Sequence, residues 1–83
     1  MKTVENLLNA AGNKKLGNHR VEHSYNREFY YYYTPICIVN DQDREFVIDA
    51  SFGTVSTTRA CNAYRRQLEA QGYKEVERVR VNA

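Results

Sequence analysis

The chain has 83 residues, enough for one small domain, and its 42% hydrophobic and 27% charged residues are typical of a folded globular protein. Its net charge of +2 is far below the basic excess of proteins that coat nucleic acid. Because no stretch approaches the roughly 20 apolar residues that span a bilayer, and the start lacks a signal-peptide core, we expect a cytoplasmic protein without membrane contact.

A short helix and a strand are predicted at the start of the chain. Apolar residues at helical spacing indicate a helix over residues 3–11, capped by Thr3 and stopped by Gly12. Glycines and asparagines predict a loop over residues 12–18. From residue 19 to residue 25 polar and apolar side chains alternate, which favours a strand.

The next predicted strand covers residues 28–39 and contains four consecutive tyrosines, Tyr30 to Tyr33. A strand sends alternate side chains to opposite faces, so both faces are aromatic there. One alternate pair is expected in the core of this small protein, and the other is half-exposed or covered by a partner.

Pro35 interrupts this strand and affects which tyrosines face inward. Proline cannot donate to the sheet ladder, so it must lie at a bulge or face no neighbouring strand. The core pair is therefore either Tyr30 with Tyr32 or Tyr31 with Tyr33. If Pro35 leaves the phase unchanged, parity with the following isoleucines places Tyr30 and Tyr32 inward.

A hairpin and a second helix follow. An Asp- and Asn-rich turn after the tyrosine strand leads to a return strand over residues 44–49. Ser56 or Thr57 is expected to cap the second helix, and Gly72 to end it. A last strand is predicted over residues 73–82. The inward stripe of the second helix comprises Thr57, Ala60, Cys61, Tyr64 and Leu68.

The expected order is helix, three strands, helix, strand (α-β-β-β-α-β). Hairpin connections imply antiparallel pairing, and the apolar stripe of the second helix requires it to pack on one face of the sheet. The whole chain, residues 1–83, is predicted to form a single α+β domain.

No pattern indicates catalysis, so we expect a protein that is not an enzyme. Cys37 and Cys61 lie in apolar contexts without metal-binding spacing and are predicted to be buried free thiols. On a strand, His19 and His23 have Cα atoms roughly 13 Å apart and cannot share an ion. The glycines form no phosphate loop, and the acidic hairpin tip lacks the glycine and final acid of a calcium loop. No cofactor, metal or small-molecule substrate is predicted.

Residues 52–68 carry a recognisable motif. Gly53 and the run Ser56-Thr57-Thr58-Arg59-Ala60-Cys61 contain the Gly, the Ser and the Ala of a pattern that opens a second helix with Ser-Lys-Lys-x-Ala-Lys. In this pattern, and in its order of elements, the chain resembles the double-stranded RNA-binding domain. The lysines that would contact phosphates are replaced by Thr57, Thr58 and Cys61, and the family's Pro-His pair is missing. The resemblance therefore implies topology.

A second resemblance covers about residues 29–74. The chain contains Tyr33-Thr34-Pro35-Ile36, a short acidic turn, Ser56-Thr57-Thr58-Arg59, Tyr64-Arg65-Arg66 and Gly72-Tyr73. In these motifs it resembles a group of small phage and prophage proteins without assigned function. The resemblance implies a small accessory protein made inside a bacterial cell and gives no residue a catalytic role.

Two binding roles remain. In the first, the tyrosine-rich sheet contacts a protein partner or a second copy of the chain, and Tyr31 and Tyr33 are the candidate contacts. In the alternative, basic side chains contact the backbone of a nucleic acid while tyrosines stack on bases. The candidate nucleic-acid contacts are Lys14, Lys15, Arg59, Arg65 and Arg66.

Overall fold

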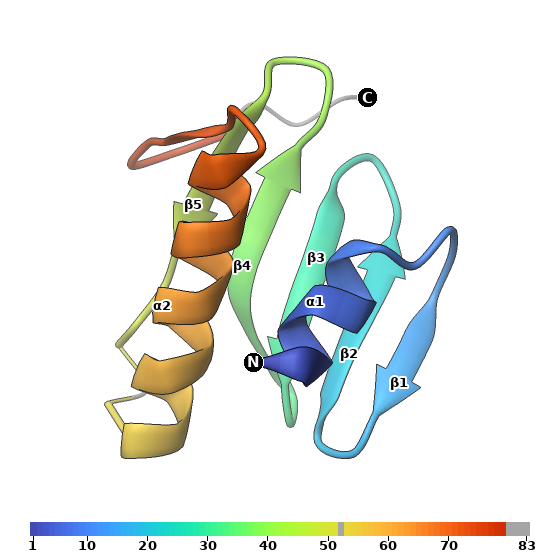
Figure 1. Cartoon of the computed structure of the whole chain (residues 1–83), viewed down its shortest axis with the longest axis vertical. Helices are drawn as coiled ribbons and strands as arrows, with labels where there is room; N and C mark the ends of the chain where they lie inside the picture. Colours follow the sequence, from blue (N-terminus) through green and yellow to red (C-terminus); the bar gives the residue numbers. More distant parts are fainter. Residues whose placement is uncertain (52, 80–83) are drawn as a thin grey trace.

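Two helices lie against one face of a β-sheet in the computed structural model, which describes residues 1–51 and 53–79 (Figure 1). The helices are α1 (Lys2–Leu8) and α2 (Val55–Ala70). The strands are β1 (Lys14–Leu16), β2 (His19–His23), β3 (Arg27–Tyr31), β4 (Thr34–Asn40), β5 (Glu45–Ile48) and β6 (Lys74–Glu75). The predicted α+β class, with the second helix packed on one face of the sheet, is confirmed.

The strands lie in the sheet in the same order as in the sequence. Neighbours from β1 to β5 pair antiparallel, whereas β6 pairs parallel with β5. This parallel edge arises because α2 carries the chain back along the sheet before β6 begins. The prediction of a wholly antiparallel sheet is therefore wrong at this edge. The predicted last strand shrinks to residues 74–75, and residues 80–82 lie outside the described chain.

The tyrosine run is folded into a turn instead of one long strand. β3 ends at Tyr31 and β4 begins at Thr34, so Tyr32 and Tyr33 connect them. Tyr32 has a φ of 56°, in the left-handed region that few tyrosines adopt. Its N–H donates to the carbonyl of Asn18 at 2.7 Å, which fixes the turn against the neighbouring hairpin. The prediction of one long strand over residues 28–39, interrupted at Pro35, is wrong at Tyr32 and Tyr33, because this tertiary contact overrides the β propensity of tyrosine.

Pro35 lies at a β-bulge, one of the two places that the sequence predicts for it. Phe29 pairs with Cys37 and Tyr30 pairs with Pro35, so the intervening Ile36 has no opposite residue. Ile36 and Cys37 are consequently both buried, although they are adjacent in the chain. The bulge shifts the phase on which the inward prediction for Tyr30 and Tyr32 depends.

The tyrosines are therefore not placed inward and outward as their alternation in the sequence predicts. Tyr31 lies on the same sheet face as the buried Phe29 and packs against the core, whereas Tyr30 lies on the opposite face. Tyr32 and Tyr33 are exposed at the turn. The prediction that Tyr30 and Tyr32 form the inward pair is therefore wrong, and neither alternate pair is buried together.

The core lies between the sheet and the two helices. All five residues of the predicted inward stripe of α2 are buried, and the ring centroid of Tyr64 lies 4.8 Å from that of Phe29. Each fully buried large apolar side chain contributes about 1.5–3 kcal/mol to stability. The buried apolar residues are Val4, Leu7, Leu8, Val21, Phe29, Ile36, Cys37, Val39, Phe46, Ala60, Cys61, Ala63, Tyr64 and Leu68.

The amino end of α2 is capped by Thr54, two residues before the first predicted cap. Its hydroxyl oxygen accepts a hydrogen bond from the Thr57 N–H at 3.1 Å. The prediction of Ser56 or Thr57 as the cap is therefore wrong. Thr57 is instead buried, and its hydroxyl lies 2.8 Å from that of Thr54. Thr54 satisfies the N-cap role because its backbone is extended there.

The carboxyl end of α2 has the geometry that Gly72 predicts. Gly72 has a φ of 89°, its N–H donates to the Glu69 carbonyl, and the Tyr73 N–H donates to the Leu68 carbonyl, both at 3.0 Å. This is a Schellman motif.

The first helix is shorter than predicted: α1 begins after Met1 without a side-chain cap and ends before Asn9. The proposed Thr3 cap and Gly12 stop are therefore not used.

Candidate interaction surface

Exposed large apolar and aromatic side chains gather at one end of the molecule. The β1–β2 turn, the β3–β4 turn and the start of α2 lie at the lower end in Figure 1. Tyr33 is 90% exposed, Val55 83% and Tyr32 48%. Met1 lines the same hollow as Val55. Among the described residues only Tyr25, in the β2–β3 turn, is a large exposed apolar or aromatic residue elsewhere.

A hollow of about 580 Å³ opens between the start of α2, the β1–β2 turn and α1. Its lining is mixed. Leu16, Tyr31 and Val55 contribute apolar atoms, and His19 and Arg59 contribute polar groups. Its lining includes Met1, Leu16, His19, Tyr31, Val55 and Arg59. Such a mixed concave surface is typical of binding sites in proteins.

Two further hollows adjoin the main one. The first, of about 100 Å³, is lined by Lys15, Asn18, Arg20, Tyr32 and Tyr33 and shares Asn18 with the main hollow. The second, of about 440 Å³, runs along the outer side of α2 to Arg66 and shares Val55 and Arg59 with it. We call the combined surface the basic end surface. It comprises Met1, Lys15, Leu16, Asn18, His19, Arg20, Tyr31, Tyr32, Tyr33, Val55, Arg59 and Arg66.

The charged side chains that line the basic end surface are all positive. None of the described residues that line its three hollows is an aspartate or a glutamate. The cations are Lys15, Arg20, Arg59 and Arg66, and of these only Arg20 forms an ion pair with a described residue, Glu22, at 2.7 Å. The first turn of α2 also lacks an acidic residue that would offset the positive end of its dipole. The surface therefore favours a negatively charged ligand.

Most tyrosine rings of the run already have aromatic or cationic neighbours. The guanidinium of Arg20 lies 4.0 Å from the ring centroid of Tyr30. Tyr31 lies between His19, at 4.7 Å, and Tyr32, at 4.6 Å between ring centroids. The Asn18 amide donates to the Tyr32 hydroxyl at 3.0 Å. These contacts form a rigid base from which Tyr33 projects.

His19 is a partly buried titratable group of the main hollow. Burial lowers its pKa, so the imidazole is held neutral near pH 7. Its Nδ1 is buried and has no hydrogen-bond partner among the described residues. The ring stacks on Tyr31 and serves as packing for the floor of the hollow.

Comparison with known proteins gives no relative for this surface. No protein-family model, curated protein or solved structure matches the chain. The function of the basic end surface is therefore argued from the chemistry and placement of its own residues.

The five basic residues predicted to contact nucleic acid do not come together. Lys15, Arg59 and Arg66 line the basic end surface. Arg65 instead forms a bidentate pair with Glu75, and its Nε lies 2.7 Å from the carboxylate. That hydrogen bond raises the pKa of Arg65 further. Lys14 lies on the edge strand β1, on the face shared with Val21.

The two predicted tyrosine contacts also differ in placement. Tyr33 is the most exposed residue of the run, whereas Tyr31 is half-buried against the core and presents one side to the main hollow. Tyr32 and Arg20 belong to the surface and were missed by the sequence pattern. The turn inside the tyrosine run brings Tyr32 to both Asn18 and Arg20, and no local sequence pattern indicates that turn.

The two cysteines are buried and free, as predicted. Burial raises the pKa of the Cys37 thiol and of the Cys61 thiol, so neither is a reactive thiolate at neutral pH. In the described part of the chain no group of three or more His, Cys, Asp or Glu residues is arranged to hold a metal ion. Within residues 1–51 and 53–79, no helix has the length and apolarity needed to cross a membrane.

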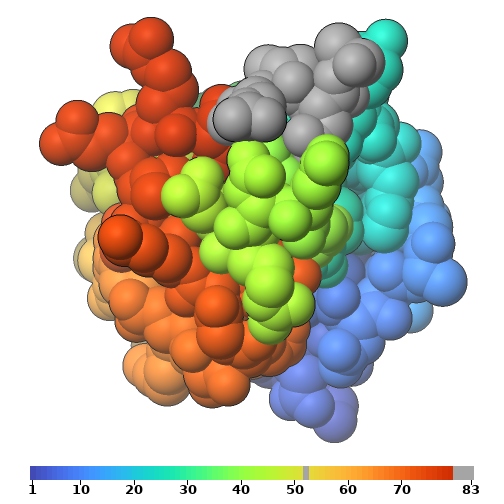
Figure 2. All heavy atoms as spheres, turned by 90° about the horizontal axis from the view of Figure 1, so that it is seen from above, coloured from blue at the N-terminus to red at the C-terminus, as the bar shows by residue number. Residues whose placement is uncertain are grey.

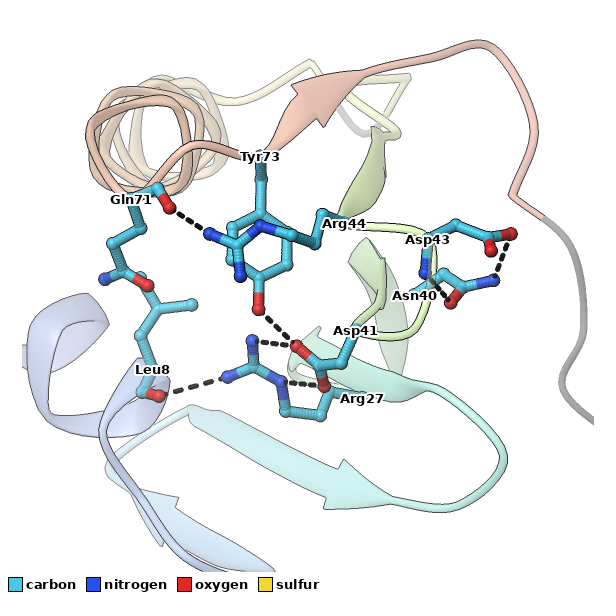
Figure 3. A network of polar contacts seen from close by, with 8 residues as sticks. All are labelled: Leu8, Arg27, Asn40, Asp41, Asp43, Arg44, Gln71 and Tyr73. Atoms are coloured by element: carbon cyan, nitrogen blue, oxygen red, sulfur yellow. Dashed lines mark hydrogen bonds and ion pairs between the residues drawn. The ribbon is translucent and has the colours of Figure 1, made fainter.

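A polar network occupies the opposite end, where the β4–β5 turn lies beside the end of α2 (Figures 2 and 3). The Asp41 carboxylate accepts hydrogen bonds from Arg27 and from the Tyr73 hydroxyl, at 2.6 Å for the latter. Burial alone would raise the pKa of Asp41, but these bonds outweigh it and hold the pKa below its usual range. The guanidinium of Arg44 lies over the Tyr73 ring and donates to the Gln71 carbonyl.

This network holds distant segments of the chain together. Its charged groups are engaged within the protein, and they connect α1, the β4–β5 turn and the segment after α2. The acidic hairpin tip is therefore part of the framework through Asp41. At the basic end, Lys15, Arg59 and Arg66 form no ion pair with a described residue, whereas Arg20 pairs with Glu22.

Proposed function

We propose that the protein is a small, non-enzymatic accessory protein that binds a protein partner through the basic end surface. The observation that carries this proposal is the gathering of Met1, Tyr32, Tyr33 and Val55 at one end of the molecule. Contiguous exposed apolar side chains mark contact surfaces in soluble proteins. The resemblance in short motifs to phage and prophage proteins, and a site of action in the cytoplasm, belong to the same proposal.

The composition of the surface suits a protein contact. Tyrosine, methionine and arginine are enriched at protein interfaces, where they combine large contact area with polar groups. Here Tyr33 projects from a turn that Asn18 and Arg20 fix by hydrogen bonds to Tyr32. A side chain presented on a rigid base loses little conformational freedom on binding. Tyr33 is therefore the central contact that we propose.

The test compares two exposed tyrosines at opposite ends of the molecule. Tagged wild-type protein, Tyr33→Ala and Tyr25→Ala are used to capture proteins from the cells that produce the chain naturally. The same proteins are examined by sedimentation velocity for self-association. We expect a captured protein, or a dimer, that Tyr33→Ala loses and Tyr25→Ala retains. Equal capture by both variants, or no capture and a strict monomer, overturns the proposal.

A second candidate is the binding of nucleic acid, and the observation that favours it is the acid-free lining with four cations. Neutralising phosphates with Lys and Arg releases counterions, so such binding weakens steeply with salt. Fluorescence anisotropy with single- and double-stranded oligonucleotides, at low and at physiological salt, tests it. Binding that Arg59→Gln and Lys15→Gln weaken would support this role. If no oligonucleotide binds even at low salt, the nucleic-acid-binding role is ruled out.

A further inference from the structure

The charge of the basic end surface indicates the chemistry of its partner. Lys15, Arg59 and Arg66 have no ion pair with any described residue, and the amino end of α2 adds the positive end of a helix dipole. Complementary charge steers association and selects partners. An acidic segment satisfies these groups, whereas a basic one is repelled.

The main hollow adds an apolar requirement. It lies between Arg59 on α2 and the β1–β2 turn, and Leu16, Tyr31 and Val55 present apolar atoms to it. Its volume of about 580 Å³ has room for a large aliphatic or aromatic side chain. Such a side chain buried in a hollow is the usual anchor of a peptide contact.

The tyrosines argue for a peptide over a nucleic acid. Base stacking needs ring faces that are free. One face of Tyr30 is covered by Arg20, and Tyr31 contacts both His19 and Tyr32, so within the described tyrosine run Tyr33 has the most exposed ring. Arg59 lines the main hollow and Arg66 follows it along the outer side of α2, whereas Lys15 lies with Arg20 and Tyr30 on the other face of the sheet. This arrangement suits a short peptide in which acids adjoin an apolar residue.

We infer that the partner binds through an acidic segment whose large apolar side chain enters the main hollow while neighbouring carboxylates reach Arg59 and Arg66. This inference rests on the proposed function and specifies its partner. The contacts are exposed ion pairs around one apolar anchor, so binding weakens with salt but persists at physiological ionic strength.

Selection from a library of random linear peptides displayed on phage tests the inference. The full chain is immobilised, and retained peptides are sequenced and then synthesised. We expect enrichment of Asp and Glu around a Leu, Ile, Phe or Trp. Each exposed ion pair lost should weaken binding about fivefold, so Arg59→Gln lowers the affinity of such peptides by about that factor. Lys74→Gln, an equal charge change on exposed β6 at the opposite end, leaves the affinity unchanged.

The experiment distinguishes failure of the acidic-segment inference from failure of the proposed function. Retained peptides without an excess of acids, or with equal affinity for Arg59→Gln, overturn the acidic-segment inference while leaving a protein contact in place. No retained peptide, together with binding of a single-stranded oligonucleotide, overturns both and favours the nucleic-acid role. Circular dichroism of each variant shows that a lost affinity is not lost folding.

Discussion

The guanidinium of Arg27 forms a bidentate ion pair with the carboxylate of Asp41, with N to O distances of 2.7 and 2.8 Å. Arg27 also donates to the Leu8 carbonyl at 3.0 Å, so one side chain joins the end of α1 to the β4–β5 turn (Figure 3). Tyr73 reaches the same carboxylate from the segment after α2. Three parts of the chain that are far apart in sequence therefore meet at Asp41.

Asp41→Asn should lower the free energy of unfolding by about 1 kcal/mol at pH 7, since the side chain is partly exposed and solvent screens the pair. The pKa of Asp41 is depressed in the folded state. Its stabilisation is therefore fully present above the unfolded pKa of about 3.9 and is lost as pH falls through the folded value. Urea unfolding between pH 7 and pH 2 measures both effects.

The matched control for this pH dependence is Glu69→Gln, which removes an exposed carboxylate from α2. Wild type and Glu69→Gln should lose stability on acidification to the same extent, and Asp41→Asn should lose less. If all three proteins follow the same pH curve, the pair contributes nothing measurable to folding.

Thr54→Ala should destabilise the protein by about 1 kcal/mol because the Thr57 N–H loses its side-chain acceptor. Ser56→Ala, at the other exposed hydroxyl of the same segment, should change stability by less than about 0.5 kcal/mol. Thermal or urea unfolding of the two variants compares them directly. A larger effect of Ser56→Ala would place the cap where the sequence alone suggests it.

Local rules in the sequence accounted for the carboxyl end and the buried stripe of α2 and for the α+β class. Gly72 followed by Tyr73 predicts a Schellman motif, and the motif forms. Helical spacing predicts a stripe from Thr57 to Leu68, and all of it is buried. These features depend on neighbours within a few residues, which a sequence pattern contains.

The turn inside the tyrosine run depends on contacts that no local pattern contains. Tyr32 takes a left-handed conformation without being Gly or Asn, and its N–H and carbonyl are held by Asn18 and Arg20 from the adjacent hairpin. A bulge at Pro35 is one of the two alternatives that the sequence predicts, but its effect on phase follows only from the register of β3 and β4. Consequently Tyr33 could be named as a candidate contact from sequence, whereas Tyr32 and Arg20 could not.

Both cysteine thiols should react slowly with iodoacetamide in the folded protein. Cys37 and Cys61 are buried, and burial raises the pKa of each thiol, so access and thiolate content are both low. Mass spectrometry should show no alkylation at pH 7.5 over a period in which the urea-unfolded chain is labelled twice. Rapid labelling of the native protein would contradict the burial of the core between α2 and β4.

Tyr31 and Tyr33, which the sequence places in one outward pair, should respond differently to truncation. Tyr33→Ala should change the free energy of unfolding by less than about 0.5 kcal/mol, since the side chain is exposed. Tyr31→Ala removes contacts with His19, Tyr32 and the core and should cost about 1–3 kcal/mol. Urea unfolding measures both, with Tyr64→Ala as a fully buried reference that should cost about 3–5 kcal/mol. Equal, small effects of Tyr31→Ala and Tyr33→Ala would mean that Tyr31 does not belong to the floor of the hollow. If only Tyr31→Ala destabilises the protein, Tyr33→Ala is the suitable variant for binding experiments, because it alters the surface while the fold beneath it stays intact.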